Sequence, residues 1–413
     1  MVIELVKEFL QDMRSHRMRT ALTLIAITWG TLSVVLLLAF GSGFGDAMEE
    51  GMVNAWNRVV ILYGGETGKV YDGLPKDRPI RLTEADATLL KETVPDIVLI
   101  SPEYEKNVEI QYGKTQMTTE CEGAGPDFEV MRTMYPQAGG RFIDENDIKY
   151  RKRSLFLGPK VARALFKDRK PIGKTVMLDN VPFTVIGIMG KKLQTSMNNG
   201  PDSWRAIIPY STFRIIYGKR HVNSILIRGG DPGTQARMMR DIRKVLAAKY
   251  RFDPTDDRAI NMFDTMRIDE MIKKITLGLD IFLGAVGLFT LMIAGVGVAN
   301  VMYVVVKERT LEIGIKLAVG AKKTYVLWQF VFETLLISFI GGSSGLLLSW
   351  GVVAATGLLN TSSGALRFLG RPVLSVGIML FTVIALTLIG LLAGVFPARR
   401  AASVNPVESL RYE

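Results

Sequence analysis

The 413-residue sequence is poor in the side chains that build metal and redox sites. It contains one cysteine, Cys121, and two histidines, His16 and His221. A single cysteine excludes an internal disulfide, so any part of the chain outside the cytoplasm must be stable without one. These few soft ligands cannot make a tetrahedral metal site. We therefore expect no metal ligands in this chain.

Nucleotide-binding and catalytic motifs are missing as well. The stretch 172–175, Ile-Gly-Lys-Thr, has the ending of a phosphate-binding loop, but the glycine required five positions before Gly173 is replaced by Asp168. An aspartate would repel a phosphate, so we interpret the stretch as a turn before a hairpin. The sequence also lacks a Gly-x-Ser-x-Gly elbow. It predicts no catalytic residue and no cofactor bound by this chain.

The formal net charge of +11 is spread over the whole sequence. Residues 42–274 carry 37 Lys and Arg against 31 Asp and Glu, and the remaining residues carry 14 against 9. The excess in 42–274 is dilute and forms no basic run with interleaved aromatic residues, which argues against nucleic-acid binding. The excess elsewhere lies beside long apolar segments, where it is typical of membrane topology.

Long apolar segments are what the sequence has in abundance. Four of them reach the ~20 residues that a helix needs to cross a bilayer, and they cover residues 20–41, 275–306, 325–357 and 373–396. Basic residues precede the first segment and follow the last, and these include Arg14, Arg17, Arg19, Arg399 and Arg400. By the positive-inside rule both termini are predicted to be cytoplasmic. A cleaved signal peptide fits less well, because segment 20–41 is longer than a usual apolar signal region.

The rest of the chain divides around these segments. Residues 1–19 predict an amphipathic cytoplasmic helix, 358–372 a short outer loop and 397–413 a cytoplasmic tail. Residues 42–274 mix strand and helix patterns without any membrane-length run, and they predict an extracytoplasmic α+β domain of two subdomains. The expected fold is therefore an α-helical membrane protein with four transmembrane helices and a large α+β domain between the first two. Glycines 41, 43 and 45 are predicted to loosen the junction with the first span.

One polar stretch, 307–324, separates the second and third apolar segments. At 100° per residue Leu311, Ile315 and Ala318 share one face of a helix, and Ile313 and Leu317 lie nearly opposite. One face can rest on the membrane helices, and the other is left for a partner. The stretch is predicted to be a cytoplasmic helix lying along the membrane.

Glu333 is the one carboxylate well inside the third apolar segment. An ionisable group at such a position is a functional candidate by default. It lies about two turns from the cytoplasmic end, and a proton path would need a second such group. We favour a bond across the helix bundle over an ion path.

Several motifs together resemble the MacB/FtsX/Lol-type permeases of ABC transporters. They are the run 307–321 (KERTLEIGIKLAVGA), Gln329, Phe330 and Glu333, the glycine pair 341–342, and the ending 396–402 with 405–411. Within 42–274, residues 140–142, 171–174 and 183–187 resemble the periplasmic core domain of MacB-type permeases. The chain is most similar in pattern to a MacB-type permease subunit without a fused ATPase.

The resemblance implies a mechanism and a set of partners. It implies a subunit of the bacterial inner membrane that forms a homodimer or a heterodimer with a related permease. A separate cytoplasmic ABC ATPase would bind ATP and Mg²⁺, and a periplasmic adaptor and an outer-membrane exit duct are further candidate partners. ATP-driven movement of the outer domain would export a substrate. Two alternatives stay open: a FtsX-like signalling module that moves no cargo, and a Lol-type lipoprotein-extracting permease.

The same resemblance implies that the helix after the second span docks on the ATPase. The residues expected to couple the two proteins are Glu308, Arg309, Thr310, Glu312, Ile313, Gly314, Lys316, Leu317, Gly320 and Ala321.

Overall fold

The computed structural model describes residues 17–56, 58–167, 169–194, 200–358 and 370–403. The helix expected over 1–19, the outer loop and the cytoplasmic tail lie largely outside these ranges. The chain divides into two compact units, one formed by Met1–Ala47 with Lys273–Glu413 and the other by Met48–Ile272. We call them the membrane unit and the outer unit.

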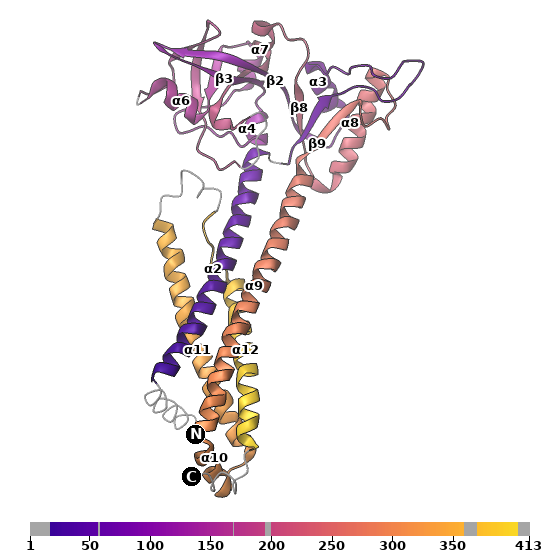
Figure 1. The fold of residues 1–413 in the computed structure, drawn as a ribbon. Coiled ribbons are helices and arrows are strands. Elements are labelled where there is room, and N and C mark those ends of the chain that lie inside the picture. Colours follow the sequence, from indigo (N-terminus) through magenta and orange to yellow (C-terminus); the bar gives the residue numbers. More distant parts are fainter. Residues whose placement is uncertain (1–16, 57, 168, 195–199, 359–369, 404–413) are drawn as a thin grey trace. The chain divides into compact units, whose positions relative to one another are not determined.

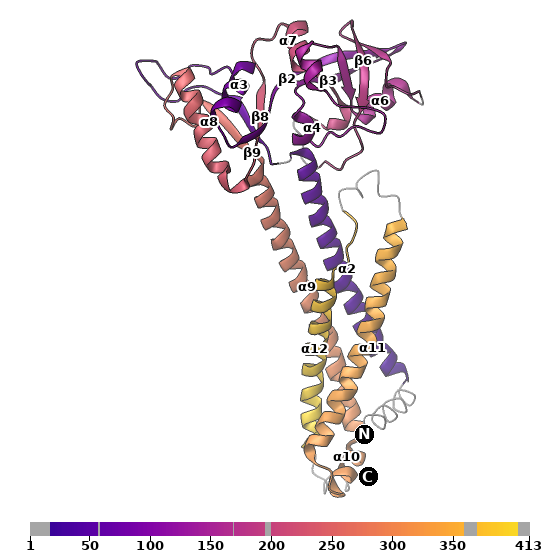
Figure 2. The same ribbon diagram turned by 180° about the vertical axis from the view of Figure 1, so that it is seen from behind.

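The membrane unit contains helices that are long and apolar enough to cross a bilayer (Figures 1 and 2). There are four of them in the described part of the chain: α2 (Arg17–Ala55), α9 (Thr265–Glu308), α11 (Lys323–Leu358) and α12 (Val376–Ala402). The predicted fold class is thereby confirmed. Both α2 and α9 extend beyond the apolar segments 20–41 and 275–306 and continue into the outer unit.

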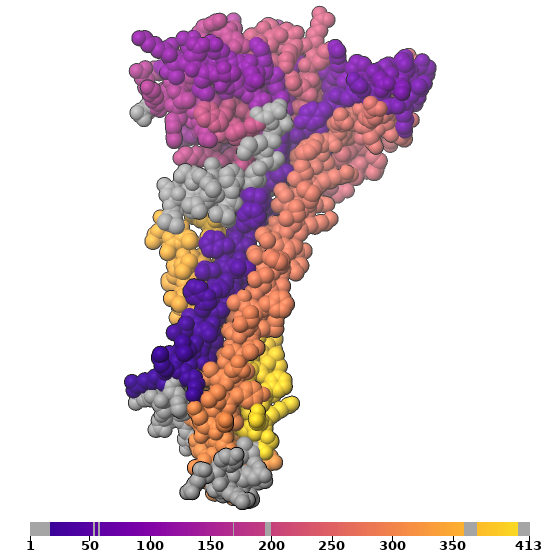
Figure 3. Space-filling view, in the orientation of Figure 1, coloured from indigo at the N-terminus to yellow at the C-terminus, as the bar shows by residue number. Residues whose placement is uncertain are grey.

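Glycines allow these helices to approach one another closely. A Cβ atom added at Gly287 would lie 2.9 Å from the Val34 side chain, and one added at Gly345 would lie 2.6 Å from Thr31. These contacts join α2 to α9 and to α11, and Figure 3 shows α2 and α9 side by side. Small residues have this role at membrane helix interfaces generally.

The prediction that glycines 41, 43 and 45 loosen a junction is wrong. Helix α2 passes through all three without interruption. Gly41 and Gly45 instead lie against Leu283 and Thr276 of α9, where an added Cβ would come within 2.6 and 2.4 Å of those side chains. The glycines serve close packing, because each removes a side chain at a helix contact.

The outer unit is built on a nine-stranded sheet with the order β3-β7-β4-β6-β5-β2-β8-β1-β9. The strands are β1 (Val60–Gly64), β2 (Ile97–Tyr112), β3 (Thr115–Ala124), β4 (Ser154–Leu157), β5 (Thr175–Leu178), β6 (Val181–Ile188), β7 (Arg205–Pro209), β8 (Ser224–Gly229) and β9 (Ile260–Asp264).

Two lobes share the long strand β2. The first lobe has the order β1, α3 (Glu84–Thr93), β2, β8, α8 (Gln235–Tyr250) and β9, which is a split βαββαβ arrangement. The second lobe is inserted between β2 and β8. It holds β3 to β7 with α4 (Phe128–Met131), α5 (Glu145–Lys149), α6 (Pro159–Phe166) and α7 (Tyr210–Tyr217). The two expected subdomains are therefore continuous through one strand.

Local sequence signals explain several elements of the outer unit. Thr83 and Asp86 form a capping box at the start of α3, and the helix ends before Pro95. Asp179 and Asn180 connect β5 to β6 with φ angles of 41° and 66°. Two consecutive positive φ angles are typical of the tight hairpin turn that fits the twist of paired strands.

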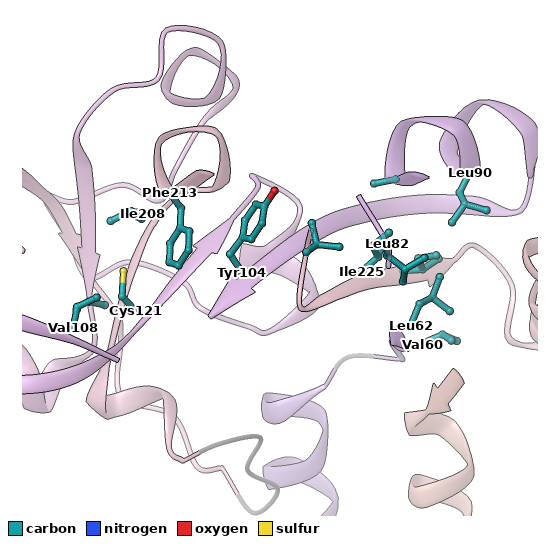
Figure 4. Close-up of a cluster of buried hydrophobic side chains, with 14 of the residues drawn as sticks. Val60, Leu62, Leu82, Leu90, Tyr104, Val108, Cys121, Ile208, Phe213 and Ile225 are labelled. Carbon is teal, nitrogen blue, oxygen red and sulfur yellow. The ribbon is translucent and has the colours of Figure 1, made fainter. Parts of the chain in front are cut away.

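The core of the outer unit runs through both lobes (Figure 4). In the second lobe Tyr104 stacks on Phe213 with ring centroids 5.3 Å apart, and Cys121 is buried in the same cluster. In the first lobe the cluster includes Leu62 and Leu90. Burial raises the pKa of the Cys121 thiol far above its usual range, so the thiol stays protonated and unreactive while the outer unit is folded.

Candidate coupling site

The chain turns sharply between α9 and the short helix α10 (Thr310–Ala318). Helix α9 ends at Glu308, and Arg309 between the two helices has φ −95° and ψ 13°. The Thr310 hydroxyl donates hydrogen bonds to the carbonyl oxygens of Val306 at 3.1 Å and Lys307 at 2.8 Å. These bonds cover carbonyl groups that the end of α9 leaves without intrahelical partners. The predicted polar stretch is therefore a helix of its own.

Helix α10 has one exposed and one buried apolar face, as the residue spacing predicted. Leu311 and Ile315 are 51% and 47% exposed, and Val319 just beyond the helix is 85% exposed. Ile313 is 3% exposed and belongs to the core of the membrane unit with Val326 and Phe330. An apolar stripe with this exposure costs free energy in water, which makes it a candidate contact surface.

The residues proposed for coupling therefore fall into three groups by burial. Ile313 and Gly314 are buried, so they hold α10 against α11 and cannot touch a partner directly. A second group is half-buried and consists of Arg309, Thr310, Lys316, Leu317 and Ala321. The third group, Glu308, Glu312 and Gly320, is exposed. The sequence pattern did not name Leu311, Ile315 or Val319 as coupling residues, although they are the exposed apolar side chains.

Ion pairs fix the start of α10. Arg19 of α2 makes a bidentate pair with Glu308, at 2.7 and 2.9 Å. Arg309 Nη1 lies 3.3 Å from Oε1 of Glu333 in α11, where the Glu333 side chain is 4% exposed. The predicted bond of Glu333 across the bundle thus has a defined partner. Arg19 was interpreted from sequence only as a topology signal, because nothing in the pattern links it to a residue 289 positions away.

The end of α10 is closed by a glycine motif. Gly320 has a φ of +98°, its N–H donates to the Leu317 carbonyl at 3.1 Å, and the Ala321 N–H donates to the Lys316 carbonyl at 3.0 Å. This is the Schellman arrangement, which favours glycine because a side chain is strained at positive φ. Gly320 and Ala321 thus set the direction in which the chain leaves α10 and enters α11.

A shallow hollow of about 650 Å³ lies next to this turn. Its lining residues are Ala321, Lys322, Thr324, Tyr325 and Trp328. Trp328 is 63% exposed. Sequence reasoning passed over Tyr325 and Trp328, although aromatic residues at the end of an apolar segment are a known signal of a membrane interface.

The outer unit contains a separate, buried ionic cluster. Arg132 and Asp202 are both fully buried and form an ion pair, and Lys192 Nζ lies 2.6 Å from Asp202 Oδ2. The Arg132 guanidinium lies 3.9 Å from the ring centre of Trp56, beyond the end of α2. Arg205 pairs with Glu122 in the same part of the sheet. Sequence patterns could not reveal this cluster, because its members come from distant segments.

Three carboxylates of this sheet face gather closely. Ligand atoms of Glu103, Glu105 and Glu122 all lie within 4.8 Å of one another. Burial, followed by repulsion from Glu105, raises the pKa of Glu103 to about 7, while the Ser224 hydroxyl donates a hydrogen bond to it. Oxygen ligands of this kind could hold Ca²⁺ or Mg²⁺. The Arg205 guanidinium already provides a counter-charge to Glu122, so this carboxylate has a partner within the protein.

A four-helix membrane unit with a large outer α+β domain inserted after its first helix defines a class of membrane permease. A family model described as the MacB-like periplasmic core domain matches residues 20–245, and one described as the FtsX-like permease C-terminal matches residues 284–406. The chain belongs to the MacB-type ABC-transporter permease family.

Curated relatives agree with this assignment. The chain is 31% identical over 99% of its length to a macrolide export ATP-binding/permease protein MacB of Vibrio parahaemolyticus, covering 60% of that protein. It is 29% identical over 99% of its length to the pyoverdine export ATP-binding/permease protein PvdT of Pseudomonas aeruginosa, covering 58% of it. The chain therefore spans about three-fifths of these relatives.

Among solved structures, the periplasmic region of MacB from Actinobacillus actinomycetemcomitans is similar to this chain. The match has a TM-score of 0.43 and 20% identity, and it covers 54% of this chain and 96% of the other.

Proposed function

We propose that this chain is the permease subunit of a MacB-type transporter, and that it couples ATP hydrolysis by a cytoplasmic ABC ATPase to movement of its outer domain. The movement would export a substrate from the bacterial envelope. The observation that carries the proposal is α10, whose outward face exposes Leu311 and Ile315 while its inward face is buried in the membrane unit. Such a helix can receive a partner on one side and pass a displacement to the bundle on the other.

Two continuous helices support a mechanical route for that displacement. Helix α9 has 44 residues and α2 has 39, which correspond to lengths of about 66 and 58 Å at ~1.5 Å per residue. The hydrocarbon core of a bilayer is ~30 Å thick, so both helices extend well beyond it. Rigid elements of this kind transmit motion between sites. Glu333, the buried carboxylate of α11, is paired with Arg309 and offers no separate ion path.

The proposed arrangement places both termini and α10 in the cytoplasm of a bacterium, with the chain in the inner membrane. Lys307, Arg309, Lys322 and Lys323 flank α10, and positive charges of this kind are retained on the cytoplasmic side. A second permease copy, identical or related, would face the second ATPase of the pair. An adaptor and an exit duct would receive the substrate. The names of these relatives refer to export of macrolides and of pyoverdine, which supports export as the direction.

Purification of the tagged chain from native membranes tests the proposal. The wild-type chain should carry an ABC ATPase with it, and the Leu311→Glu/Ile315→Glu variant should retain less than a tenth of that ATPase. The matched Leu311→Met/Ile315→Met variant keeps an apolar surface and should retain it fully. Melting temperatures within about 2 °C of wild type would show that the fold is intact. If the glutamate variant binds the ATPase as wild type does, α10 is not the docking element.

A further inference from the structure

An apolar groove lies between α11 and α12 in the membrane unit. It has a volume of about 320 Å³, and Figures 1 and 2 show the two helices side by side in the half of the unit nearest α10. Gly342 and Ser343 line it, and their small size leaves the recess. Most of the remaining lining is apolar and includes Phe332, Leu335, Phe339 and Leu346 of α11 and Val383 and Leu386 of α12.

This groove lies on the same line of α11 as the hollow beside the turn after α10. At 100° per residue, Phe332, Leu335 and Leu346 project within ~40° of the direction of Trp328, which lines the hollow. At ~1.5 Å per residue, the groove begins about 6 Å from Trp328 and extends for about 21 Å from Phe332 to Leu346. One leaflet of the hydrocarbon core is about 15 Å deep, half of ~30 Å. The hollow and the groove therefore match a single lipid molecule in direction and length.

Aromatic residues mark the level of the lipid headgroups. Tyr325 and Trp328 line the hollow in the first two turns of α11 and are 41% and 63% exposed. Tyrosine and tryptophan are enriched at membrane–water interfaces, because their rings are apolar with one polar group. The hollow is therefore at headgroup depth, and the groove beyond it opens towards acyl chains.

Positive charge at this end of the membrane unit exceeds the negative charge available to it. The described carboxylates of this end are already in ion pairs, namely Glu308 with Arg19, Glu312 with Lys316 and Glu333 with Arg309. Lys322 and Lys323 are exposed, and neither forms an ion pair with a carboxylate in the part of the chain that the structure describes. Lys322 lines the hollow itself. The hollow is thus complementary to an anionic group.

We propose that the hollow and the groove together bind one anionic phospholipid, with its phosphate beside Lys322 and Lys323 and an acyl chain between α11 and α12. Basic side chains near a membrane surface attract anionic lipids, and an apolar groove that opens to the bilayer can bury a lipid chain. A symmetric contact with a second copy would bring the same two lysines together, so self-pairing at the hollow is disfavoured. The site goes beyond the proposed function, and lipid binding is measured without the ATPase.

Native mass spectrometry of the full chain in detergent tests the headgroup site. The probes are phosphatidylglycerol, which is anionic, and phosphatidylcholine with the same acyl chains, which has no net charge. Wild type should retain phosphatidylglycerol with a preference of about tenfold. Lys322→Gln/Lys323→Gln should lower the preference below about twofold, whereas Lys322→Arg/Lys323→Arg should keep it.

Arg399→Gln/Arg400→Gln is the matched control, because it removes the same charge from the same end of the unit but outside the hollow. This variant should keep the preference for phosphatidylglycerol. Equal retention of both lipids by wild type would overturn the proposal. An equal loss of preference in the Arg399/Arg400 variant would also overturn it, because the attraction would then be diffuse.

Filling the groove tests the acyl-chain site. Ser343→Phe should lower the retention of both lipids by about fivefold, because its ring occupies the space of the chain. Ser344→Phe adds the same ring at a residue that does not line the groove and should leave retention unchanged. Melting temperatures in detergent identify the folded variants, and Ser343→Leu replaces Ser343→Phe if that chain does not fold. Unchanged retention by a folded Ser343 variant would overturn the proposal.

Two further outcomes separate the lipid from other occupants. Glycerol 3-phosphate, a headgroup without acyl chains, should not displace phosphatidylglycerol at equal concentration, and displacement would show that the groove has no part in binding. A folded Lys322→Gln/Lys323→Gln chain should lose its lipid preference whether or not an ATPase binds. If it keeps that preference and loses only the ATPase, the hollow is a protein contact and the lipid assignment is wrong.

Discussion

Arg309 and Glu333 join the start of the coupling helix to the third membrane helix, with Nη1 and Oε1 at 3.3 Å. Their side chains are 17% and 4% exposed, so the pair is largely removed from water. A buried charge is costly when its partner is lost, and the cost is larger than for a pair at the surface. The pair therefore holds α10 in one position relative to α11 and links two residues that the sequence analysis had treated separately.

Glu333→Gln should lower the stability of the membrane unit, because the ion pair between Arg309 and Glu333 is then lost. We expect a loss of about 2 kcal/mol, below the ~3–5 kcal/mol seen when fully buried pairs are broken. The matched control is Glu312→Gln, which removes an exposed pair with Lys316 at 3.0 Å and should cost less than about 0.5 kcal/mol. Thermal melting in detergent gives both values. A double-mutant cycle with Arg309→Gln should show a coupling energy, and strict additivity of the two changes would contradict direct pairing.

Ile313→Arg should impair folding, whereas Glu312→Arg should impair only ATPase binding, although the two residues are adjacent. Ile313 is 3% exposed in the core of the membrane unit, so an arginine there buries a charge and should lower the yield of folded protein severely. The Glu312 side chain is 52% exposed. Glu312→Arg should therefore keep the melting temperature within about 2 °C of wild type and weaken only the binding of the ATPase. Size-exclusion profiles and ATPase co-purification separate the two outcomes. A well-folded Ile313→Arg chain would show that α10 does not pack as described.

Gly320→Ala should destabilise the turn after α10. The φ of +98° is strained for any residue with a Cβ, and we expect a cost of about 1–2 kcal/mol. Gly297→Ala in α9 is a suitable control, because an added Cβ there meets nothing within 4 Å and the helix gains propensity. The comparison of the two melting temperatures in detergent checks the expectation. Equal melting temperatures for both variants would mean that the turn relaxes without strain.

The fold was largely accessible from sequence, because its signals are local. Apolar length predicted the four membrane helices, and the capping box at Thr83 and the Asp179–Asn180 turn marked elements of the outer unit. The two faces of α10 followed from residue spacing alone. The ion-pair partners of Arg19 and Glu333 could not be predicted from the sequence, because an ion pair between distant segments leaves no periodic pattern. The first span was predicted to end at residue 41, whereas α2 continues without a break to Ala55, and its last turn is buried in the core of the outer unit.

Glu103 should make the stability of the outer unit depend on pH. Its pKa is raised from 4.5 to about 7 in the folded state, so between these values the folded chain keeps a proton that the unfolded chain has lost. The free energy of unfolding should therefore fall as pH rises from 5 to 7 and level off above 7, by about 3 kcal/mol in all. Glu103→Gln should reduce this slope strongly but leave a remainder, because burial also raises the pKa of Glu120 and of Glu129. Lys192, whose pKa is lowered to about 8, titrates above this window.

Urea unfolding followed by pulse proteolysis measures this dependence between pH 5 and 7.5. The control is Glu105→Gln, which keeps the Glu103 carboxyl but removes the neighbouring charge that adds to its shift. It should reduce the slope without abolishing it, because burial is the larger cause. A slope that persists unchanged in Glu103→Gln would assign the pH dependence to another group.

A flexible insertion in α9 should separate ATPase binding from movement of the outer unit. Lys274 lies near the boundary between the two units, inside a helix that runs without interruption from Thr265 to Glu308. Four glycine and serine residues inserted after Lys274 would break its rigidity. Seven alanines at the same place lengthen it by almost two whole turns and keep its faces in phase.

With a bound ATPase, a non-hydrolysable ATP analogue should alter hydrogen exchange in the outer unit of the wild-type and alanine chains. It should leave the glycine–serine chain unchanged, although ATPase binding at α10 persists in all three. A nucleotide response that survives the flexible insertion would show that α9 does not carry the movement.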